Sequence, residues 1–276
     1  MKKLWPIPAA FFAVCCILNL TGCLLDGNLE RCVKPALMPL LCLTTMTYIL
    51  EFFSGAVRYP ERRYATPPTP WAPPSYDAEG GTSPDTALHR RKTSVATALL
   101  MCGQLFGFAG DTMLLGKGFP FFAGGIGCFL VGHIFYISLF GGKSWKGLRA
   151  WQWIVALTLC LLLVVGLVIA IGVKGVMLAP MGIYGFVLAL LIFSTLAGTI
   201  RFGGPDWWML AAGSVLFTFS DALIAVRNFG TLSPFMDGFG VMSTYLAAQS
   251  LLAAGAARLI CRGFFVPLSI QMKDNK

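Results

Sequence analysis

Two aspartates lie at the ends of apolar stretches and are the first candidates for chemistry. Asp111 closes the stretch 103–111 and Asp221 closes the stretch 213–221, and each stretch opens with a glycine at the same distance before its aspartate. A charged side chain is costly inside an apolar helix, so carboxylates in such places usually have a function. Because their surroundings match, we interpret the two carboxyl groups as a pair.

A pair of neighbouring carboxyl groups can supply an acid and a base side by side. Two such groups cannot both ionise easily, so one of them is expected to keep its proton near neutral pH. Glycosidases use this arrangement to protonate an acetal and to direct water at an oxocarbenium ion. Two alternatives stay open. The aspartates could be the protonation sites of a transporter, or they could form structural ion pairs, Asp111 with Lys34 or Lys117 and Asp221 with Arg227.

Other kinds of catalytic site have little support in the sequence. There is no Gly-x-Ser-x-Gly motif, and Ser220 has no evident general base. The chain has two histidines, and His89 lies in a segment that we assign to a linker, so zinc would require His133 together with both aspartates. The nine cysteines lie mostly in apolar runs and form no Cys-x-x-Cys pair. We therefore predict no metal and no redox cofactor.

The composition is that of a membrane protein. Hydrophobic residues make up 57% of the 276 residues and charged residues only 12%, and apolar runs of a length that spans a bilayer recur along the chain. The net charge of +9 lies mainly in short loops between these runs. We interpret it as charge that sets the topology and faces anionic membrane lipids, and not as a nucleic-acid surface.

The apolar runs predict an all-α polytopic protein with eight transmembrane helices. Residues 1–57 should hold the first two, Leu4–Leu25 and a second that starts at Lys34-Pro35. Residues 58–94 are rich in proline and read as a disordered linker. Residues 95–265 should hold the other six helices, and residues 266–276 a tail. The first run also resembles a signal peptide, but its length and the short distance to the next span favour a retained helix.

The basic residues predict the orientation of the chain. With eight spans, 16 Lys and Arg residues fall on the side of the termini and five on the other side. The positive-inside rule places both termini in the cytoplasm. The oligomeric state has no signal in the sequence.

Polar residues in the predicted spans gather toward the opposite side. Asp111 and Asp221 should both lie within about 12 Å of the same interface, given the helical rise per residue. The polar residues expected near them are Lys34, His133, Tyr136, Tyr184, Tyr245 and Gln249. Such residues should line an internal cavity, although His133 could be a core histidine bonded to Tyr136. The matching positions of the aspartates also suggest a parallel four-plus-four repeat.

Several short motifs, in order, resemble the YhhN-type lysoplasmalogenase family. These are Gly110-Asp111 with Leu114-Leu115, Phe129-Leu130-x-x-His133-x-x-Tyr136, Leu216-Phe217-x-x-Ser220-Asp221, and Thr244-Tyr245-x-x-x-Gln249, with Lys34-Pro35 at the head of the second span. The similarity extends over nearly the whole chain except the linker 58–94, which looks like an insertion.

This resemblance implies an integral membrane hydrolase without a cofactor. Its substrate would be a lysophospholipid, a lysoplasmalogen, whose vinyl ether bond is cleaved to a fatty aldehyde and glycerophosphoethanolamine or glycerophosphocholine. Asp111 and Asp221 would be the catalytic pair, and Lys34 could meet the phosphate. The membrane would be the endoplasmic reticulum in a eukaryote or the inner membrane in a bacterium. A related hydrolase that acts on another ether lipid, an epoxide or an amide stays open.

Overall fold

The computed structural model describes residues 3–25, 27–54 and 84–265, which are helical almost throughout and contain no strand. The helices are α1 (Pro6–Leu25), α2 (Gly27–Phe53), α3 (Pro84–Leu114), α4 (Phe119–Ser144), α5 (Ala150–Ile171), α6 (Leu178–Phe202), α7 (Pro205–Phe229) and α8 (Val241–Cys261), with the short turns η1 (Gly175–Met177) and η2 (Met236–Gly240) before α6 and α8. Within these ranges, eight helical segments are long and apolar enough to cross a membrane. The prediction of an all-α protein with eight such helices is confirmed.

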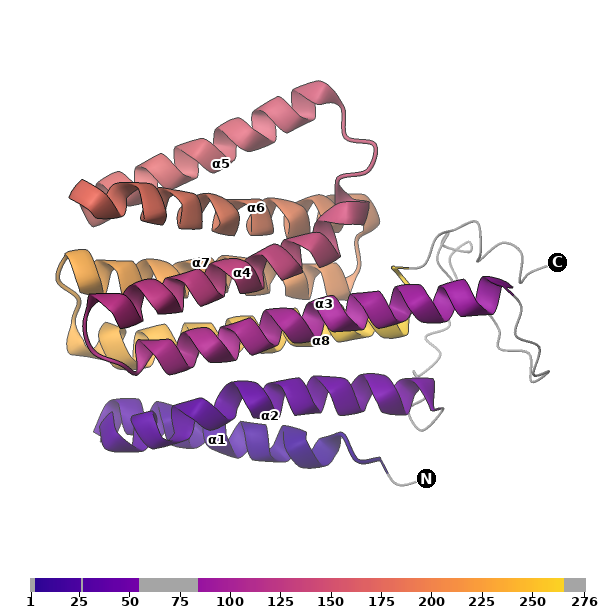
Figure 1. The fold of residues 1–276 in the computed structure, drawn as a ribbon, viewed down its shortest axis with the longest axis horizontal. Helices are drawn as coiled ribbons and strands as arrows, with labels where there is room; N and C mark the ends of the chain where they lie inside the picture. The colour runs from indigo at the N-terminus through magenta and orange to yellow at the C-terminus, as the bar shows by residue number, and fades with distance from the viewer. Residues whose placement is uncertain (1–2, 26, 55–83, 266–276) are drawn as a thin grey trace.

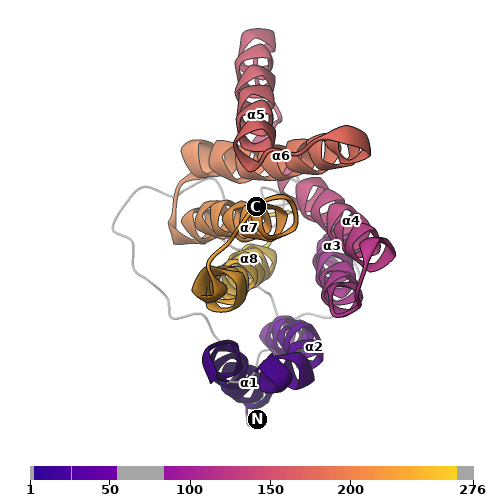
Figure 2. The same cartoon turned by 90° about the vertical axis from the view of Figure 1, so that its left-hand side faces the viewer.

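The helices lie roughly side by side, and consecutive helices run in opposite directions (Figure 1). Seen from the end of the bundle, α7 and α8 occupy the middle, α1 and α2 lie on one side, and α5 lies furthest out on the other side (Figure 2). The closest pairs are α3 with α4, α7 with α8, and α1 with α2, and α6 packs on both α4 and α7. As a result, α3, α4, α6, α7 and α8 surround one interior.

Burial differs sharply between the central and the peripheral helices. Of the most apolar residues in 236–261, which form η2 and α8, 67% are buried, whereas only 17% are buried in the corresponding part of α5. The outer face of α5 exposes large aliphatic side chains, including Ile154, Leu161 and Ile169. Aliphatic side chains on the outside of a membrane bundle meet lipid, so this exposure fits a helix at the periphery. The four-plus-four repeat stays a prediction.

Two helices begin earlier than the sequence predicts. Residues 84–94, assigned to the linker, belong to α3, because Pro84 occupies a first-turn position where its missing N–H costs no hydrogen bond. α2 begins at Gly27, so Pro35 lies inside the helix and does not start it. Proline is tolerated inside membrane helices, where neighbouring groups can satisfy the freed carbonyl. The rest of the predicted linker, residues 58–83, and the tail 266–276 lie outside the described residues.

Glycines allow α3 and α4 to approach closely beside Asp111. A methyl group on Gly103 would overlap the ring of Tyr136, and one on Gly110 would lie 3.0 Å from the ring of Phe129. On α4, a methyl group on Gly132 would lie 3.1 Å from the carbonyl oxygen of Gly103. The aromatic side chains of α4 can therefore lie directly against the backbone of α3, as small residues generally permit in membrane bundles.

We predict that Gly103→Ala destabilises the protein and that Gly127→Ala does not. The new methyl group at 103 must displace the buried ring of Tyr136, and overpacking of this kind costs about 1–3 kcal/mol. Gly127 lies on the same pair of helices but has nothing within 4 Å of the added carbon. Thermal unfolding of the two variants in one detergent measures the difference. Equal midpoints would contradict the close packing of α3 on α4.

Candidate active site

Asp111 lies near the end of α3 and is held by a chain of hydrogen bonds. Its side chain is 4% exposed, and the hydroxyl of Tyr245 on α8 donates to its Oδ2 at 2.6 Å. One turn further along α8, Nε2 of Gln249 donates to the oxygen of Tyr245 at 3.4 Å. The hydroxyl of Tyr136 on α4 donates to Oε1 of Gln249 at 3.3 Å. The network thus fixes Asp111 through side chains from α4 and α8.

Asp221 lies on α7 and has a similar partner. It is 8% exposed, and the hydroxyl of Tyr184 on α6 donates to its Oδ2. The neighbouring Ser220 donates through its Oγ to the carbonyl oxygen of Val241, which ties α7 to the start of α8. The carboxyl groups of Asp221 and Asp111 are close enough to interact electrostatically. Two aspartates from distant parts of the chain therefore share one interior, and each accepts a hydrogen bond from a tyrosine.

Aromatic rings fill the space around the two carboxyl groups. The centroid of the Phe217 ring lies 5.5 Å from that of Tyr245 and 6.0 Å from that of Phe129. His133 is buried, and its ring stands edge-on to Phe217 with centroids 4.5 Å apart. The alternative of a hydrogen bond between His133 and Tyr136 is wrong for this structure: the hydroxyl of Tyr136 donates to Gln249, and among the described residues neither ring nitrogen of His133 is bonded to that hydroxyl. His133 lies in the same interior, 5.9 Å from Tyr184 between ring centroids.

Basic residues do not pair directly with either aspartate in the part of the chain that the structure describes. Lys34 on α2 is half-buried and lies within electrostatic reach of Asp111. Arg227 is bound instead to Asp237, with 3.3 Å between Nη1 and Oδ1. The structural ion pairs considered from the sequence are therefore not formed. Among the described residues, His133 and the aspartates also do not form a group of three metal-ligand side chains.

Asp221 lies where two cavities meet. The first, here called the chain cavity, lies between α5, α6 and α7, and its lining includes Val164, Val168 and Leu188 together with Tyr184 and Asp221. The second, the inner cavity, lies between α4, α6 and α7, and Tyr184 and Asp221 line it as well. Apart from these two residues and Thr218, their walls are apolar. The chain cavity has a volume of about 40 Å³ and the inner cavity about 10 Å³, room for about one water molecule each. Asp221 is thus the carboxyl group at both of these narrow spaces.

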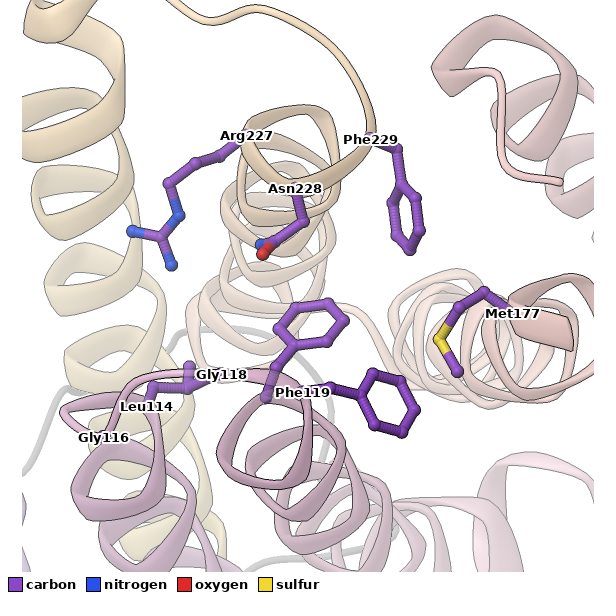
Figure 3. Close-up of a pocket in the computed structure, with 9 residues that line it drawn as sticks. Leu114, Gly116, Gly118, Phe119, Met177, Arg227, Asn228 and Phe229 are labelled. Carbon is purple, nitrogen blue, oxygen red and sulfur yellow. The ribbon is translucent and has the colours of Figure 1, made fainter. Parts of the chain in front are cut away.

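A third cavity, the mouth cavity, opens at the ends of α3, α4 and α7 and has a volume of about 340 Å³. Leu114 and Phe122 line both this cavity and the inner cavity, so the two adjoin. Figure 3 shows Arg227 and Asn228 at the end of α7 on one side of it, with Phe119, Met177 and Phe229 around the other side.

The structure brings seven of the eight sequence-predicted site residues into the one interior. These are Asp111, His133, Tyr136, Tyr184, Asp221, Tyr245 and Gln249. Lys34 is not part of this buried group and interacts with it only electrostatically, through Asp111. The rings of Phe129 and Phe217 also lie in this interior. Both residues belong to the motifs quoted from the sequence, but they were not assigned to the site, because an aromatic residue in an apolar helix carries no signal of its own. Arg227 was considered only as a partner of Asp221, yet it lines the mouth cavity.

The comparisons with known proteins agree with one another. The chain is 33% identical to lysoplasmalogenase TMEM86A of Homo sapiens over 162 residues, which are 57% of this chain and 64% of the relative. It is 31% identical to lysoplasmalogenase TMEM86A of Bos taurus over 170 residues, which are 59% of this chain and 67% of the relative. It is 32% identical to lysoplasmalogenase TMEM86B of Mus musculus over 164 residues, 59% of this chain and 65% of the relative.

These matches cover about two thirds of each relative, and slightly less for the human and mouse proteins. No solved structure matches the chain. The model of the YhhN family matches residues 86–256, a region that holds both aspartates and all of the tyrosines hydrogen-bonded to them. Because that match covers more than half of the chain, the protein belongs to the YhhN family.

Proposed function

We propose that this protein is a membrane hydrolase that cleaves the vinyl ether bond of lysoplasmalogens to a fatty aldehyde and a glycerophospho-base. The observation that carries the proposal is the pair of buried, electrostatically interacting carboxyl groups beside apolar cavities. The relatives named lysoplasmalogenases support the same substrate class. A substrate with one long hydrocarbon chain and a polar head suits a site that lies between an apolar cavity and the end of the bundle.

One aspartate would act as the general acid and the other as the general base. Asp221 lines the cavities, so it is the group that can reach the double bond and deliver a proton to carbon. Asp111 does not line either cavity and lies within reach of the positive charge of Lys34. We assign it the role of the carboxylate that stabilises the cation and orients water. Tyr184 and Tyr245 would hold the two carboxyl groups in place through their hydrogen bonds.

The reaction would run in three steps that consume one water. The double bond takes the proton of Asp221 onto its outer carbon, which leaves an oxocarbenium ion at the carbon bonded to oxygen. Water adds to that carbon and gives a proton to the carboxylate of Asp111, forming a hemiacetal. The hemiacetal then gives its hydroxyl proton to Asp221 and breaks its bond to the glycerol oxygen, which takes the proton from Asp111. The aldehyde is released, and both aspartates return to their initial protonation states. General acid and base catalysis of this kind typically contributes about 10²–10⁴-fold to the rate.

We predict that Asp111→Asn and Asp221→Asn each lower aldehyde release from lysoplasmenylethanolamine by about 10²-fold or more, because each removes one member of the acid–base pair. The matched control is Asp237→Asn, which changes an exposed carboxyl group outside the site. Purified protein and mass spectrometry of the products provide the measurement. A double Asn variant with wild-type activity would reject the mechanism. Because product formation is measured, the test also separates a hydrolase from the proton-coupled transporter considered from the sequence.

We further predict that the chain cavity sets the preferred chain length. The chain cavity of about 40 Å³ must widen between α5, α6 and α7 to admit a hydrocarbon chain, and Val168→Trp should block this space. The variant should lower kcat/KM for long-chain substrates about tenfold or more relative to short-chain ones, since each buried CH₂ contributes about 0.8 kcal/mol. Val165→Trp is the matched control, because Val165 lies one turn away on the lipid-exposed face of α5. If both variants change the chain preference alike, the hydrocarbon chain does not bind in this cavity.

We also propose that both termini face the cytoplasm, as the distribution of basic residues indicates. Lys117 and Lys146 are exposed at opposite ends of α4. In a cysteine-free background expressed in the inner membrane of bacterial cells, Lys117→Cys in intact cells should react with a thiol reagent that does not cross this membrane, whereas Lys146→Cys should react only after permeabilisation. The reverse pattern would place the site on the other side of the membrane.

A further inference from the structure

We propose that the mouth cavity binds the phosphate group of the substrate and that Arg227 is its main ligand, with Asn228 beside it. This inference rests on the proposed function and adds to it the position of the polar head. The mouth cavity adjoins the inner cavity through Leu114 and Phe122, and the inner cavity contains Asp221. The inner cavity has a volume of only about 10 Å³, so a lipid whose vinyl ether bond meets Asp221 can extend its head to the end of the bundle only when the side chains of Leu114 and Phe122 move apart.

The mouth cavity has one polar side. In Figure 3 the side chains of Arg227 and Asn228 come from the last turn of α7, and the amide of Asn228 is turned toward the loop that precedes α4. Nδ2 of Asn228 donates to the carbonyl oxygen of Ile224 at 2.7 Å, which fixes the orientation of the amide. Arginine suits phosphate particularly well, because its planar guanidinium group can donate two parallel hydrogen bonds.

The spacing along α7 fits the substrate. Asn228 follows Asp221 by seven residues, so the two share one face of the helix and are separated by about 10 Å along the axis. Seven covalent bonds join the protonated carbon of the vinyl ether to the phosphorus of a lysoplasmalogen, a reach of about 8 Å in an extended chain of such bonds. The vinyl ether can thus meet Asp221 while the phosphate lies beside Asn228. Arg227 follows Asp221 by six residues, so it begins about a third of a turn away and reaches the phosphate through its long side chain, which lines the mouth cavity.

Charge around the mouth favours an anion. The exposed Lys117 stands between two glycines that line the mouth cavity, and Lys174 precedes the turn that ends at Met177. Among the described residues, no carboxylate lines the mouth cavity. The nearest acidic partner is Asp237, which is bound to Arg227 outside the lining.

The ion pair with Asp237 leaves Arg227 available. The side chains of Arg227 and Asp237 are 38% and 43% exposed, and their shortest distance is 3.3 Å. Exposed ion pairs contribute little to stability, so Arg227 can turn to a phosphate without a large loss. Lys34, which the sequence analysis assigned to the phosphate, does not line the mouth cavity.

The test compares two substrates that differ only in the phosphate. Arg227→Gln should raise KM for lysoplasmenylethanolamine about tenfold or more, because a charge-assisted hydrogen bond is lost. Its kcat/KM for the corresponding 1-alkenylglycerol, which has no phosphate, should stay within about twofold of the wild type. Arg227→Lys should recover part of the affinity, since it keeps the charge but not the two parallel bonds.

Three controls separate binding from structure. Asp237→Asn removes the ion pair with Arg227, so a purely structural role of Arg227 predicts the same defect, whereas phosphate binding predicts none. Arg201→Gln changes an exposed arginine at the far end of the bundle, and it should leave KM and kcat/KM unchanged for both substrates. Lys34→Gln tests the other phosphate ligand. The assignment would be overturned if Arg227→Gln lowered kcat/KM equally for both substrates, or if Asp237→Asn showed the same defect as Arg227→Gln. It would also be overturned if only Lys34→Gln caused a loss that is selective for the substrate with the phosphate.

If the wild-type protein cleaves neither substrate, the proposed reaction fails but the phosphate site can still be judged. In that case the readout is binding of lysophosphatidylethanolamine compared with monoacylglycerol by the detergent-purified protein. Arg227→Gln should weaken binding of the first lipid about tenfold and leave binding of the second unchanged. Equal binding of lysophosphatidylethanolamine by the wild type and the variant would refute the site.

Discussion

The cost of placing two carboxyl groups inside an apolar bundle governs the rest of this structure. A carboxylate in an apolar surrounding is expensive unless it is hydrogen-bonded or neutralised by a proton or a cation. Here each aspartate accepts a hydrogen bond from one tyrosine, and both lie in one interior. A second full negative charge in that interior would raise the cost again, and the proposed mechanism therefore places a proton on Asp221 and leaves Asp111 ionised. That proton is the reagent that the proposed reaction needs.

The bundle is organised so that five helices meet at this pair. α8, the most buried helix, provides Tyr245 and Gln249 one turn apart, while α6 provides Tyr184 for the carboxyl group on α7. Glycine at 103 lets Tyr136 pack against α3 and reach Gln249. Hydrogen bonds between helices hold the acids, and Asp221 lines the two narrow apolar cavities whereas Asp111 does not. This asymmetry gives two chemically identical side chains different surroundings, which is the basis for assigning them different roles.

Much of the fold and of the candidate site could be predicted from the sequence, because membrane helices and buried charges produce strong sequence patterns. Apolar runs gave the eight helices, and the aspartates stood out because charge is rare in such runs. The predicted starts of two helices were less accurate. Pro84 was assigned to the linker but lies at the start of α3, and Pro35 was taken as the start of a helix but lies inside α2. The partner of each aspartate could not be read from the sequence, since tyrosines 37 and 134 residues away supply the hydrogen bonds. The role of Arg227 also needed the structure, which shows that its ion pair is with Asp237.

The most direct test of the account is to detect the proton on the aspartate pair. Infrared difference spectroscopy of the purified protein near neutral pH can resolve the C=O stretch of a protonated carboxylic acid. The account predicts such a band in the wild type, its loss in Asp221→Asn, and its persistence in Asp111→Asn. A wild-type spectrum without this band, or one whose band is unchanged in Asp221→Asn, would contradict the claim that Asp221 holds a proton near neutral pH.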